Sequence, residues 1–473
     1  MTKRPNIILL VMDSVRMTHM SCYGYSRPTT PNIDALARQA TVYDQAISVG
    51  CWTLPVHASL FTGLYPISHG VTVSKEALPN NFPTLAQQLK EAGYQTASFS
   101  NNAYVSEVTN LTQGFDTVED LWRLRSSRGT KRTKMSRVVR WLRGFGAPAE
   151  PIILLLGAMR RAWSILKPKR SDEGAQLTNE KIRAWLTKHR DPERPFFIFV
   201  NYMEPHEPYD PTSPYDRRFM PKRFSSWRIS RVGRNKKKIL SGPEKRRQED
   251  LEIIQALYDG EVAYLDAQMG DLVKEIASLG ILDDTVLVIT SDHGDSLGEH
   301  DHLGHRLTLY ERLVQVPLII RYPALFEPEA RVAQQVSLID LYPTFLELAG
   351  VDSSEANANG FYSLTALPGS DARPFLVAEN TAPKSQNSVV SRMLRTEQYK
   401  YIWKSNGQHE LYDLLDDPDE TLNLITIAPE TARKLDGQLE EWRRAHAGNQ
   451  LDTEQAEYDE PLLERLRELG YVE

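Results

Sequence analysis

Four short apolar runs along the chain each end in polar residues that can bind a metal or an anion. Runs of Val, Ile, Leu and Phe, interleaved with stretches of helical periodicity, are typical of parallel strands buried on both faces. Ligands in open parallel sheets collect beyond the carboxyl ends of the strands. The pattern therefore predicts an α/β fold with one active site at that edge. The runs are residues 7–12 before Asp13, 96–100 before Asn101 and Asn102, 196–203 before the Pro-His-Glu-Pro segment 205–208, and 285–290 before the Ser-Asp-His-Gly segment 291–294.

A further segment, residues 51–63, predicts a helix with a hydroxyl group at its start. Thr53 is a favourable N-cap, Pro55 suits the first turn, and Gly63 is a typical helix stop. The N-terminus of a helix favours an anion. A threonine hydroxyl is a poor nucleophile until a metal or a base removes its proton. Without other motifs, the simplest interpretation of Thr53 is a helix cap.

Asp13, Asp292 and His293 can supply that metal. Two carboxylates, one imidazole and the Thr53 oxygen form a hard, mostly oxygen ligand set that suits Mn²⁺, Mg²⁺, Ca²⁺ or Zn²⁺. We therefore expect one divalent ion and leave its identity open. A second acidic group could indicate another metal, but its surroundings have the pattern of an ordinary amphipathic helix. Its members are Asp259, Glu261 and Asp266.

The overall composition agrees with the α/β fold and the active site predicted above. The 473 residues are 41% hydrophobic and 25% charged with a net charge of −6, which is ordinary for a soluble globular protein. No apolar stretch reaches the roughly 18 residues of a transmembrane helix, and the first strand begins too early for a signal peptide. Only Cys22 and Cys51 are present, so no disulfide framework is implied. We expect a cytoplasmic protein.

Local charge is far from even. Residues 121–170 contain fourteen Lys and Arg and one acid, Glu150, and residues 137–143 have apolar and cationic faces at helical spacing. We interpret the stretches near 121–173 and 217–248 as basic insertions that cover the catalytic domain. The alternative is contact with a membrane surface or a lipid substrate, which would place the protein peripherally at a membrane. No nucleic acid partner is expected.

The C-terminal part predicts a smaller α+β subdomain. A stretch rich in Ser, Asn and Ala precedes it, which is typical of a linker. We therefore place a catalytic domain at residues 1–350 and a subdomain at residues 361–473. The predicted elements are strands at 393–403 and 410–414, a turn at 405–407 between them, and a helix at 429–446.

Five motifs, in the same order along the chain, resemble those of the sulfatases of the alkaline phosphatase superfamily. The resemblance implies an α/β/α sandwich around a large, mostly parallel sheet, with a smaller C-terminal α+β subdomain. It also implies metal-dependent hydrolysis of an anionic ester. The motifs are residues 6–14, 53–63, 291–300, 337–344 and 410–418.

The resemblance implies roles for individual residues. Thr53 is at the position of the nucleophile, and His57 is where sulfatases usually have Arg. His305 is where they usually have Lys, and His206 resembles a histidine that contacts the anion or the leaving group. Either His206 or His305 would protonate the leaving oxygen. The implied metal ligands are Asp13, Thr53, Asp292 and His293, and the implied substrate-binding residues are Asn102, His69 and His300.

The chain also departs from the sulfatase pattern. Sulfatases mature a cysteine to formylglycine in a Cys-x-Pro-x-Arg context, but Cys51 is two residues too early, so we expect no formylglycine. Ser14 occupies the position of a second acidic ligand. Threonine lacks the second hydroxyl by which a formylglycine hydrate expels sulfate, whereas a phospho-threonine can be resolved by in-line attack. We therefore favour a phosphodiester or phosphomonoester substrate.

Three alternatives remain open from the sequence. The first is a sulfuric ester hydrolase, that is, a sulfatase in the ordinary sense. The second is a transferase that moves a phosphoryl head group to or from a lipid. The third is a noncatalytic relative that binds an anion, although the survival of Thr53, Asp13 and the Asp292–His293 pair argues against it.

Overall fold

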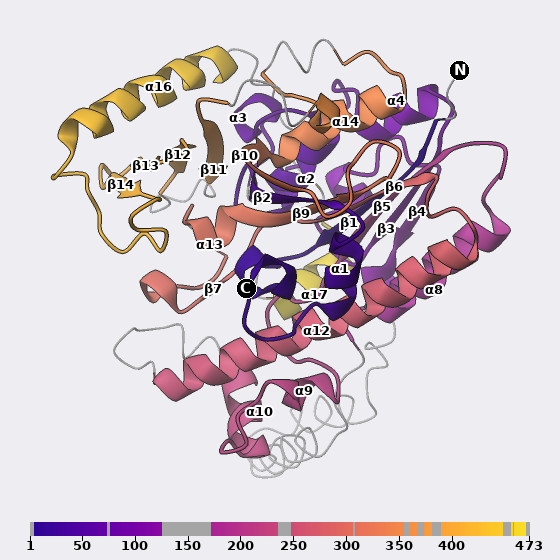
Figure 1. Cartoon of the computed structure of the whole chain (residues 1–473), viewed down its shortest axis with the longest axis horizontal. Helices are drawn as coiled ribbons and strands as arrows, with labels where there is room; N and C mark the ends of the chain where they lie inside the picture. The colour runs from indigo at the N-terminus through magenta and orange to yellow at the C-terminus, as the bar shows by residue number, and fades with distance from the viewer. Residues whose placement is uncertain are drawn as a thin grey trace, which may run out of the picture.

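An eight-stranded mixed sheet forms the centre of the molecule in the computed structural model (Figure 1). Its strand order is β10-β2-β9-β6-β1-β5-β3-β4, and β9 alone runs antiparallel to its neighbours. The structure describes residues 4–72, 76–124, 172–234, 247–305, 308–353, 360–366, 373–380, 389–447, 456 and 458–469. The strands are β1 Asn6–Met12, β2 Thr41–Ile47, β3 Gln95–Ser100, β4 Thr117–Asp120, β5 Phe196–Tyr202, β6 Thr285–Ser291, β9 Gln315–Arg321 and β10 Arg331–Ser337.

The four predicted strands lie side by side in the order β6-β1-β5-β3 and run parallel. Met12 at the end of β1 is level with both Tyr202 and Ser291, and Ser100 is level with Asn201. All four polar endings therefore share one edge of the sheet. This confirms the mostly parallel α/β fold.

Helices cover both faces of the sheet, which gives three layers (Figure 1). Alternate strand residues pack into two different apolar clusters, because successive side chains of a strand point to opposite faces. One face is covered by α2 Thr53–Thr62, α4 Leu85–Glu91 and α14 Leu341–Leu348, and the other by α1 Pro31–Ala37, α8 Ala175–Lys188 and α12 Gln248–Ser278. Within the ranges given above, no helix is both long and apolar enough to cross a membrane.

A second, four-stranded antiparallel sheet forms the core of the C-terminal part, in the order β11-β12-β13-β14. The hairpin at residues 405–407 is confirmed, and Gly407 has the positive φ of 80° that its turn requires. The single strand expected at 393–403 is wrong. A tight turn in which Thr396 and Tyr399 bond each other splits it. The elements are β11 Leu376–Asn380, β12 Ser391–Arg395, β13 Tyr399–Lys404, β14 Glu410–Asp413 and α16 Pro429–Ala447.

The C-terminal sheet is joined tightly to the catalytic part. The Glu379 backbone N–H donates to Val49 O at 2.9 Å, and the Glu379 carboxylate accepts from Ile67 N at 2.8 Å. Arg373 forms an ion pair with the buried Asp340. The boundary predicted between residues 350 and 361 stays a prediction, since residues 354–359 are outside the described part.

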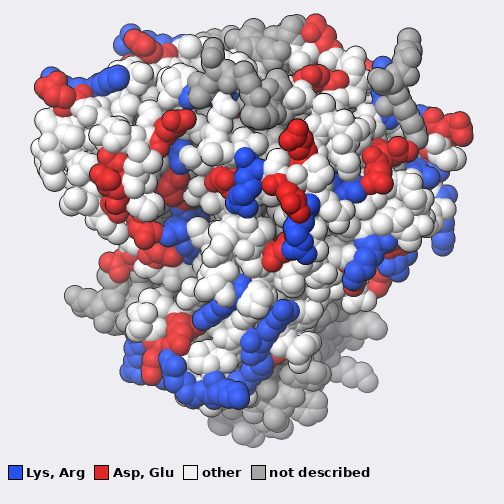
Figure 2. Space-filling model, viewed as in Figure 1, with Lys and Arg blue, Asp and Glu red and all other residues white. Residues whose placement is uncertain are grey.

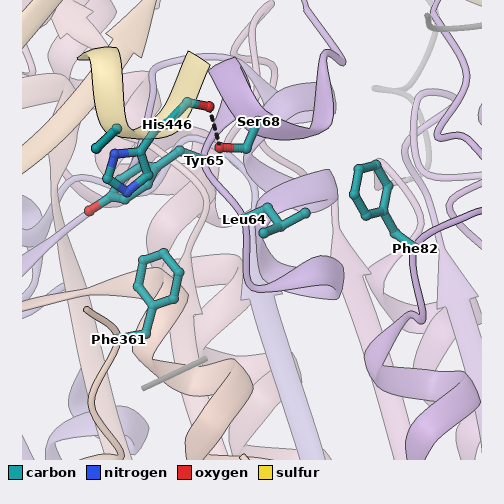
Figure 3. Close-up of a pocket in the computed structure, with 7 residues that line it drawn as sticks. Leu64, Tyr65, Ser68, Phe82, Phe361 and His446 are labelled. Atoms are coloured by element: carbon teal, nitrogen blue, oxygen red, sulfur yellow. Dashed lines mark hydrogen bonds between the residues drawn. The ribbon is translucent and has the colours of Figure 1, made fainter. Parts of the chain in front are cut away.

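A small pocket of about 90 Å³ lies at the interface between the C-terminal and catalytic parts, between α3 Pro66–His69 and α16 (Figure 3). The Ser68 hydroxyl donates to the His446 carbonyl at 3.3 Å across it. Its lining contains none of the predicted metal ligands. The lining residues are Leu64, Tyr65, Ser68, Phe82, Phe361, Ala445 and His446.

The predicted basic insertions are only partly described. Residues 125–171 and 235–246, which include the amphipathic stretch 137–143, lie outside the described residues. The described part of the second insertion forms two short helices, α9 Tyr215–Arg218 and α10 Ser226–Arg234. Both pack against α12.

Candidate active site

The ends of β1 and β6 bring Asp13, Asp292 and His293 together. One potential ligand atom from each lies within 4.8 Å of the others, and all three side chains are fully buried. Their convergence follows from the sheet register, because Met12 and Ser291 are level on neighbouring strands. The sequence prediction that these residues meet is confirmed.

Ser14 connects the two carboxylates. Its backbone has a positive φ of 64°, an uncommon conformation for serine. In this conformation its N–H donates to Asp292 Oδ1 at 3.2 Å and its hydroxyl donates to Asp13 Oδ1 at 2.9 Å. Ser14 therefore orients both candidate ligands from the position of the absent second acid.

Asn102 holds the other oxygen of Asp13. Its Nδ2 donates to Asp13 Oδ2 at 2.6 Å, and its Oδ1 accepts the backbone N–H of Tyr104 at 2.9 Å. Both polar atoms of the amide thus have partners within the protein. The geometry favours a ligand-orienting role, and the predicted contact with substrate stays a prediction.

The electrostatics of the cluster suit a cation. Burial, and then the charge of Asp292, raises the pKa of Asp13 to about 8, and burial raises the pKa of Asp292 to about 7. Asp292 Oδ2 lies 3.5 Å from His293 Nε2 and 3.9 Å from His57 Nδ1, too far for good hydrogen bonds. Two buried carboxylates without full compensation are costly. The residues present therefore fit one divalent ion.

Thr53 begins α2 and does not cap it, so the N-cap prediction is wrong. The extended Trp52 takes the N-cap position, and Thr53 is the first helical residue. Its hydroxyl lies 3.5 Å from His293 Nε2, and the side chain is 1% exposed. The geometry thus directs the hydroxyl at the metal-ligand cluster.

His57 lies one turn further along α2. Its Nδ1–H donates to the Thr53 carbonyl at 2.8 Å, and its Nε2 has no hydrogen-bond partner among the described residues. Burial lowers the pKa of His57 to about 4, so the ring is neutral at physiological pH. It therefore cannot supply the charge that an arginine has at this position.

His206 and His305 lie beside the metal-ligand cluster. The His305 ring stacks on His293 with a centroid distance of 4.5 Å, and His206 lies 5.0 Å from His305. His206 Nδ1–H donates to the Glu207 carbonyl at 2.7 Å. Burial, and then the neighbouring His305, lowers the pKa of His206 to about 3. The fold thus brings both predicted histidines to the site.

Two residues that the sequence interpretation missed lie behind His305. Asp295 is fully buried, and its Oδ1 lies 3.7 Å from His305 Nδ1. Its other oxygen accepts a hydrogen bond from the Tyr209 hydroxyl. A carboxylate beside an imidazole fixes the ring and stabilises its protonated form. The sequence signal was its position, because Asp295 lies inside the 291–300 motif that resembles the sulfatases.

His69 and His300 take part in other contacts. His69 Nε2 bonds the Ser59 hydroxyl at 3.0 Å, and its Nδ1 accepts from Val71 N at 3.1 Å. The His300 ring stacks on Tyr310 with centroids 3.9 Å apart. No contact among the described residues links either ring to Asp13, Asp292 or His293. Their predicted substrate roles stay predictions without geometric support.

The second acidic group on α12 has protein partners instead of a metal site. Asp259 bonds His19 and Arg27, both at 2.7 Å. Glu261 accepts the N–H of Asp210, and Asp266 accepts the N–H groups of α1. Among the described residues, only the Asp13–Asp292–His293 group has metal-binding geometry.

Cys51 lies two residues before Thr53, within an apolar cluster. It is 1% exposed, and the cluster includes Ile47 and Leu309. Thr53, and not this thiol, is the residue whose side chain lies against His293. The expectation that no formylglycine forms remains a prediction.

The fold and the site are those of a hydrolase with the architecture of the alkaline phosphatase superfamily. The family model "Sulfatase" matches residues 5–351, and the model for the C-terminal part of N-sulphoglucosamine sulphohydrolase matches residues 298–445. The chain belongs to the sulfatase family.

Relatives and solved structures extend this result. The chain is 25% identical to the arylsulfatase of Clostridium perfringens over 442 residues, which covers 89% of this chain and 90% of that protein. It is 27% identical to arylsulfatase K of Bos taurus over 477 residues, covering 92% of this chain and 81% of that protein. These names fit the sulfuric ester alternative better than the phosphoester preference derived from Thr53.

Two solved structures share the fold. The phosphonate monoester hydrolase of Agrobacterium radiobacter superimposes with a TM-score of 0.72 at 20% identity and covers 94% of this chain and 96% of its own. A protein solved with its substrate D-glucosamine-2-N,6-O-disulfate gives 0.73 at 21% identity, with 97% and 100% covered. Together they confirm the alkaline phosphatase-like architecture.

Proposed function

We propose that the protein is a metal-dependent hydrolase of sulfuric esters that acts at the Asp13–Asp292–His293 cluster. The observation that supports catalysis at this cluster most directly is the buried Thr53 hydroxyl, 3.5 Å from His293 Nε2. The arylsulfatase names of relatives that align over most of the chain favour a sulfate ester.

Different residues of the chain would bind the metal, attack the ester and protonate the leaving group. A divalent ion bound by Asp13, Asp292 and His293 would supply Lewis-acid polarisation of the ester and lower the pKa of the Thr53 hydroxyl. Thr53 Oγ would lose its proton to solvent and attack sulfur, the bond from sulfur to the alcohol oxygen would break, and a protonated histidine would give its proton to that oxygen. Water would then attack sulfur and break the bond from sulfur to Thr53 Oγ. One proton of that water would return to the histidine and the other to Thr53 Oγ, which frees sulfate.

His305 is the better proton donor of the two candidate histidines. Burial holds the pKa of His206 at about 3, so it is almost wholly neutral at neutral pH. His305 instead lies beside the buried Asp295, which stabilises an imidazolium. His206 would then orient the leaving group.

A phosphodiester or phosphonate monoester is the second candidate substrate. Thr53 favours it, because a single hydroxyl cannot expel sulfate by the route open to a formylglycine hydrate. The structural likeness to a phosphonate monoester hydrolase shows the shared fold alone. The proposal therefore needs a direct comparison of the substrates.

The test is turnover of 4-nitrophenyl sulfate, 4-nitrophenyl phosphate and bis(4-nitrophenyl) phosphate, each with Mn²⁺, Mg²⁺, Ca²⁺ or Zn²⁺. Thr53→Ala serves as the inactive control and Thr53→Ser as the conservative one. We expect sulfate turnover that Thr53→Ala abolishes, Thr53→Ser partly retains and a chelator removes. Turnover of the phosphorus esters alone would overturn the sulfate proposal, and stoichiometric metal without any turnover would indicate a binding protein.

A further inference from the structure

The buried turn at residues 13–16 is held by hydrogen bonds from several segments of the chain. A turn away from water needs such partners, because an unpaired backbone N–H group there is costly. Three of the four acceptors lie on or directly after strands β5 and β6, and the fourth belongs to helix α12. The four bonds run from Asp13 N to Tyr202 O at 2.9 Å, from Ser14 N to Asp292 Oδ1 at 3.2 Å, from Val15 N to Ser291 Oγ at 3.0 Å and from Arg16 N to Tyr258 Oη at 2.7 Å.

The Tyr258 hydroxyl of α12 bonds the turn twice. It accepts the Arg16 N–H at 2.7 Å and donates to the Ser14 carbonyl at 2.8 Å. It therefore bridges the backbone just after Ser14, the residue with the positive φ of 64°. A residue other than glycine keeps this conformation only where its surroundings hold it there. The two bonds from Tyr258 supply such a constraint.

The position of the Tyr258 ring is itself fixed by packing. Figure 2 shows Lys and Arg gathered at the lower edge of the molecule, over α9 and α10, and these two helices pack against α12. Tyr258, in contrast, is fully buried. Its ring meets His19 and Tyr209 edge to face, with centroid distances of 5.2 Å and 5.3 Å. Helix α12 thus presents the hydroxyl to the turn from an ordered, buried position.

Ser14 passes this constraint on to the metal-ligand cluster. Its N–H donates to Asp292 Oδ1 at 3.2 Å, and its hydroxyl donates to Asp13 Oδ1 at 2.9 Å. If Ser14 leaves the left-handed conformation, both donors move away from the two carboxylates. Groups that orient ligand side chains in this way set the affinity of a metal site.

We propose that Tyr258 is a positioning residue for the metal-ligand cluster and acts through Ser14. The inference rests on the proposed function in one respect, the binding of a divalent ion at Asp13, Asp292 and His293. Among the described residues, the Tyr258 hydroxyl bonds only the two backbone groups of the turn. Its effect on the carboxylates therefore runs through the turn.

The experiment compares two variants that remove equivalent hydroxyl groups. Tyr258→Phe is the test variant, and Tyr23→Phe is the matched control. The Tyr23 hydroxyl also donates to one backbone carbonyl, at 3.1 Å, and accepts one backbone N–H, at 3.0 Å, both of Leu318 on β9. Each variant keeps its ring and loses two bonds to the backbone, so a general loss of stability would appear in both.

The first measurement is hydrogen exchange in the metal-free protein, followed by mass spectrometry of peptides that cover residues 12–18. We expect Tyr258→Phe to speed the exchange of these amides by about tenfold or more, because the turn opens more often without its two bonds. Tyr23→Phe should leave their exchange at the wild-type rate.

The second measurement is calorimetric titration with Mn²⁺, Mg²⁺, Ca²⁺ or Zn²⁺. For the ion that the wild type binds most tightly, we expect Tyr258→Phe to lose about tenfold in affinity, as expected when a partner that orients a metal ligand is removed. Tyr23→Phe should bind the ion like the wild type. A purely structural role of Tyr258 would not separate the two variants in this titration.

Two results would overturn the inference. One is equal exchange of residues 12–18 in the two variants. The other is faster exchange in Tyr258→Phe with unchanged ion affinity, which would make Tyr258 a stabilising residue only. Failure of the aryl sulfate assay would count against the proposed function alone, because neither measurement requires turnover.

Discussion

Ser14 stands where the sulfatase pattern has a second acidic metal ligand, and restoring the acid tests what this position does. Its left-handed backbone, with φ of 64°, is one that Asp tolerates better than most residues. Ser14→Asp should therefore fit and add a third carboxylate to the cluster. We expect divalent-ion affinity to rise about tenfold or more, while the metal-free protein loses stability because three buried carboxylates repel.

Calorimetric titration with Ca²⁺ and Mg²⁺, and unfolding with and without the ion, would measure both effects. Ser14→Ala is the control, since it removes the hydroxyl bond to Asp13, keeps the backbone N–H bond to Asp292 and adds no charge. Unchanged affinity in Ser14→Asp would mean that position 14 does not face the ion.

Asp295 is the second residue whose role can be tested, because it lies 3.7 Å from the ring of His305. We expect Asp295→Asn to lower kcat by about 10²-fold or more, because the amide no longer stabilises protonated His305. The loss should be smaller for an aryl sulfate with a good leaving group, which needs less protonation. Equal losses for good and poor leaving groups would assign Asp295 a purely structural role.

For single residues, the sequence predicted which side chains reach the site better than it predicted what each of them contacts. Asp13, Thr53, Asp292 and His293 converge as expected, because strand ends and register bring them to one edge. Side-chain direction was out of reach. Whether an amide such as Asn102 faces the substrate or a ligand depends on a few ångströms of loop geometry that no spacing encodes.

The stability of the protein depends on Gly63, the residue at which helix α2 ends. Gly63 has φ of 67°, and a Cβ there would lie 2.6 Å from the Tyr342 ring. Gly63→Ala should therefore destabilise the protein by more than the ~1 kcal/mol of an ordinary left-handed glycine. Urea unfolding would measure the difference, with Gly280→Ala as control, because Gly280 is also left-handed, with φ of 69°, and has open space around it. Equal effects would show that the Tyr342 contact relaxes freely.

Helices and strands were predictable where the apolar residues follow a single spacing, either helical or strand-like. The buried strands and the helix at Pro429–Ala447 follow from runs or spacing that allow one interpretation. The strand expected at 393–403 failed because β-forming residues continue on both sides of a short turn. Its turn residues, 396–398, contain neither Gly nor Pro, so the usual signal was absent.

A buried charge network joins the two parts of the whole molecule. Glu311, in α13 Glu311–Val314, bonds Arg395 at 3.2 Å and Lys400 at 3.1 Å on the C-terminal sheet. Glu311→Gln should destabilise the protein by about 3–5 kcal/mol, since it leaves two buried cations with less compensation. The exposed Glu430→Gln should change stability by about 0.5 kcal/mol or less.

The pH dependence of this network has a definite sign. Burial alone would raise the pKa of Glu311, but Arg395 and Lys400 hold it at about 2, below its ordinary value of 4.5. The stabilisation is therefore complete above pH 4.5 and is lost as pH falls toward 2. Unfolding curves of the wild type and Glu311→Gln should converge over that interval. A constant difference would contradict the assignment.

The position of β1 has a consequence for synthesis. Its neighbours β5 and β6 begin about 190 and 280 residues later in the chain, and Ser14 bonds an aspartate 278 positions away. Residues 7–12 of this strand, which are all apolar, thus leave the ribosome long before their partner strands exist, and an exposed apolar strand is prone to aggregate. A chain that stops before β6 also lacks Asp292 and His293, so only a chain translated beyond β6 can assemble the Asp13–Asp292–His293 cluster.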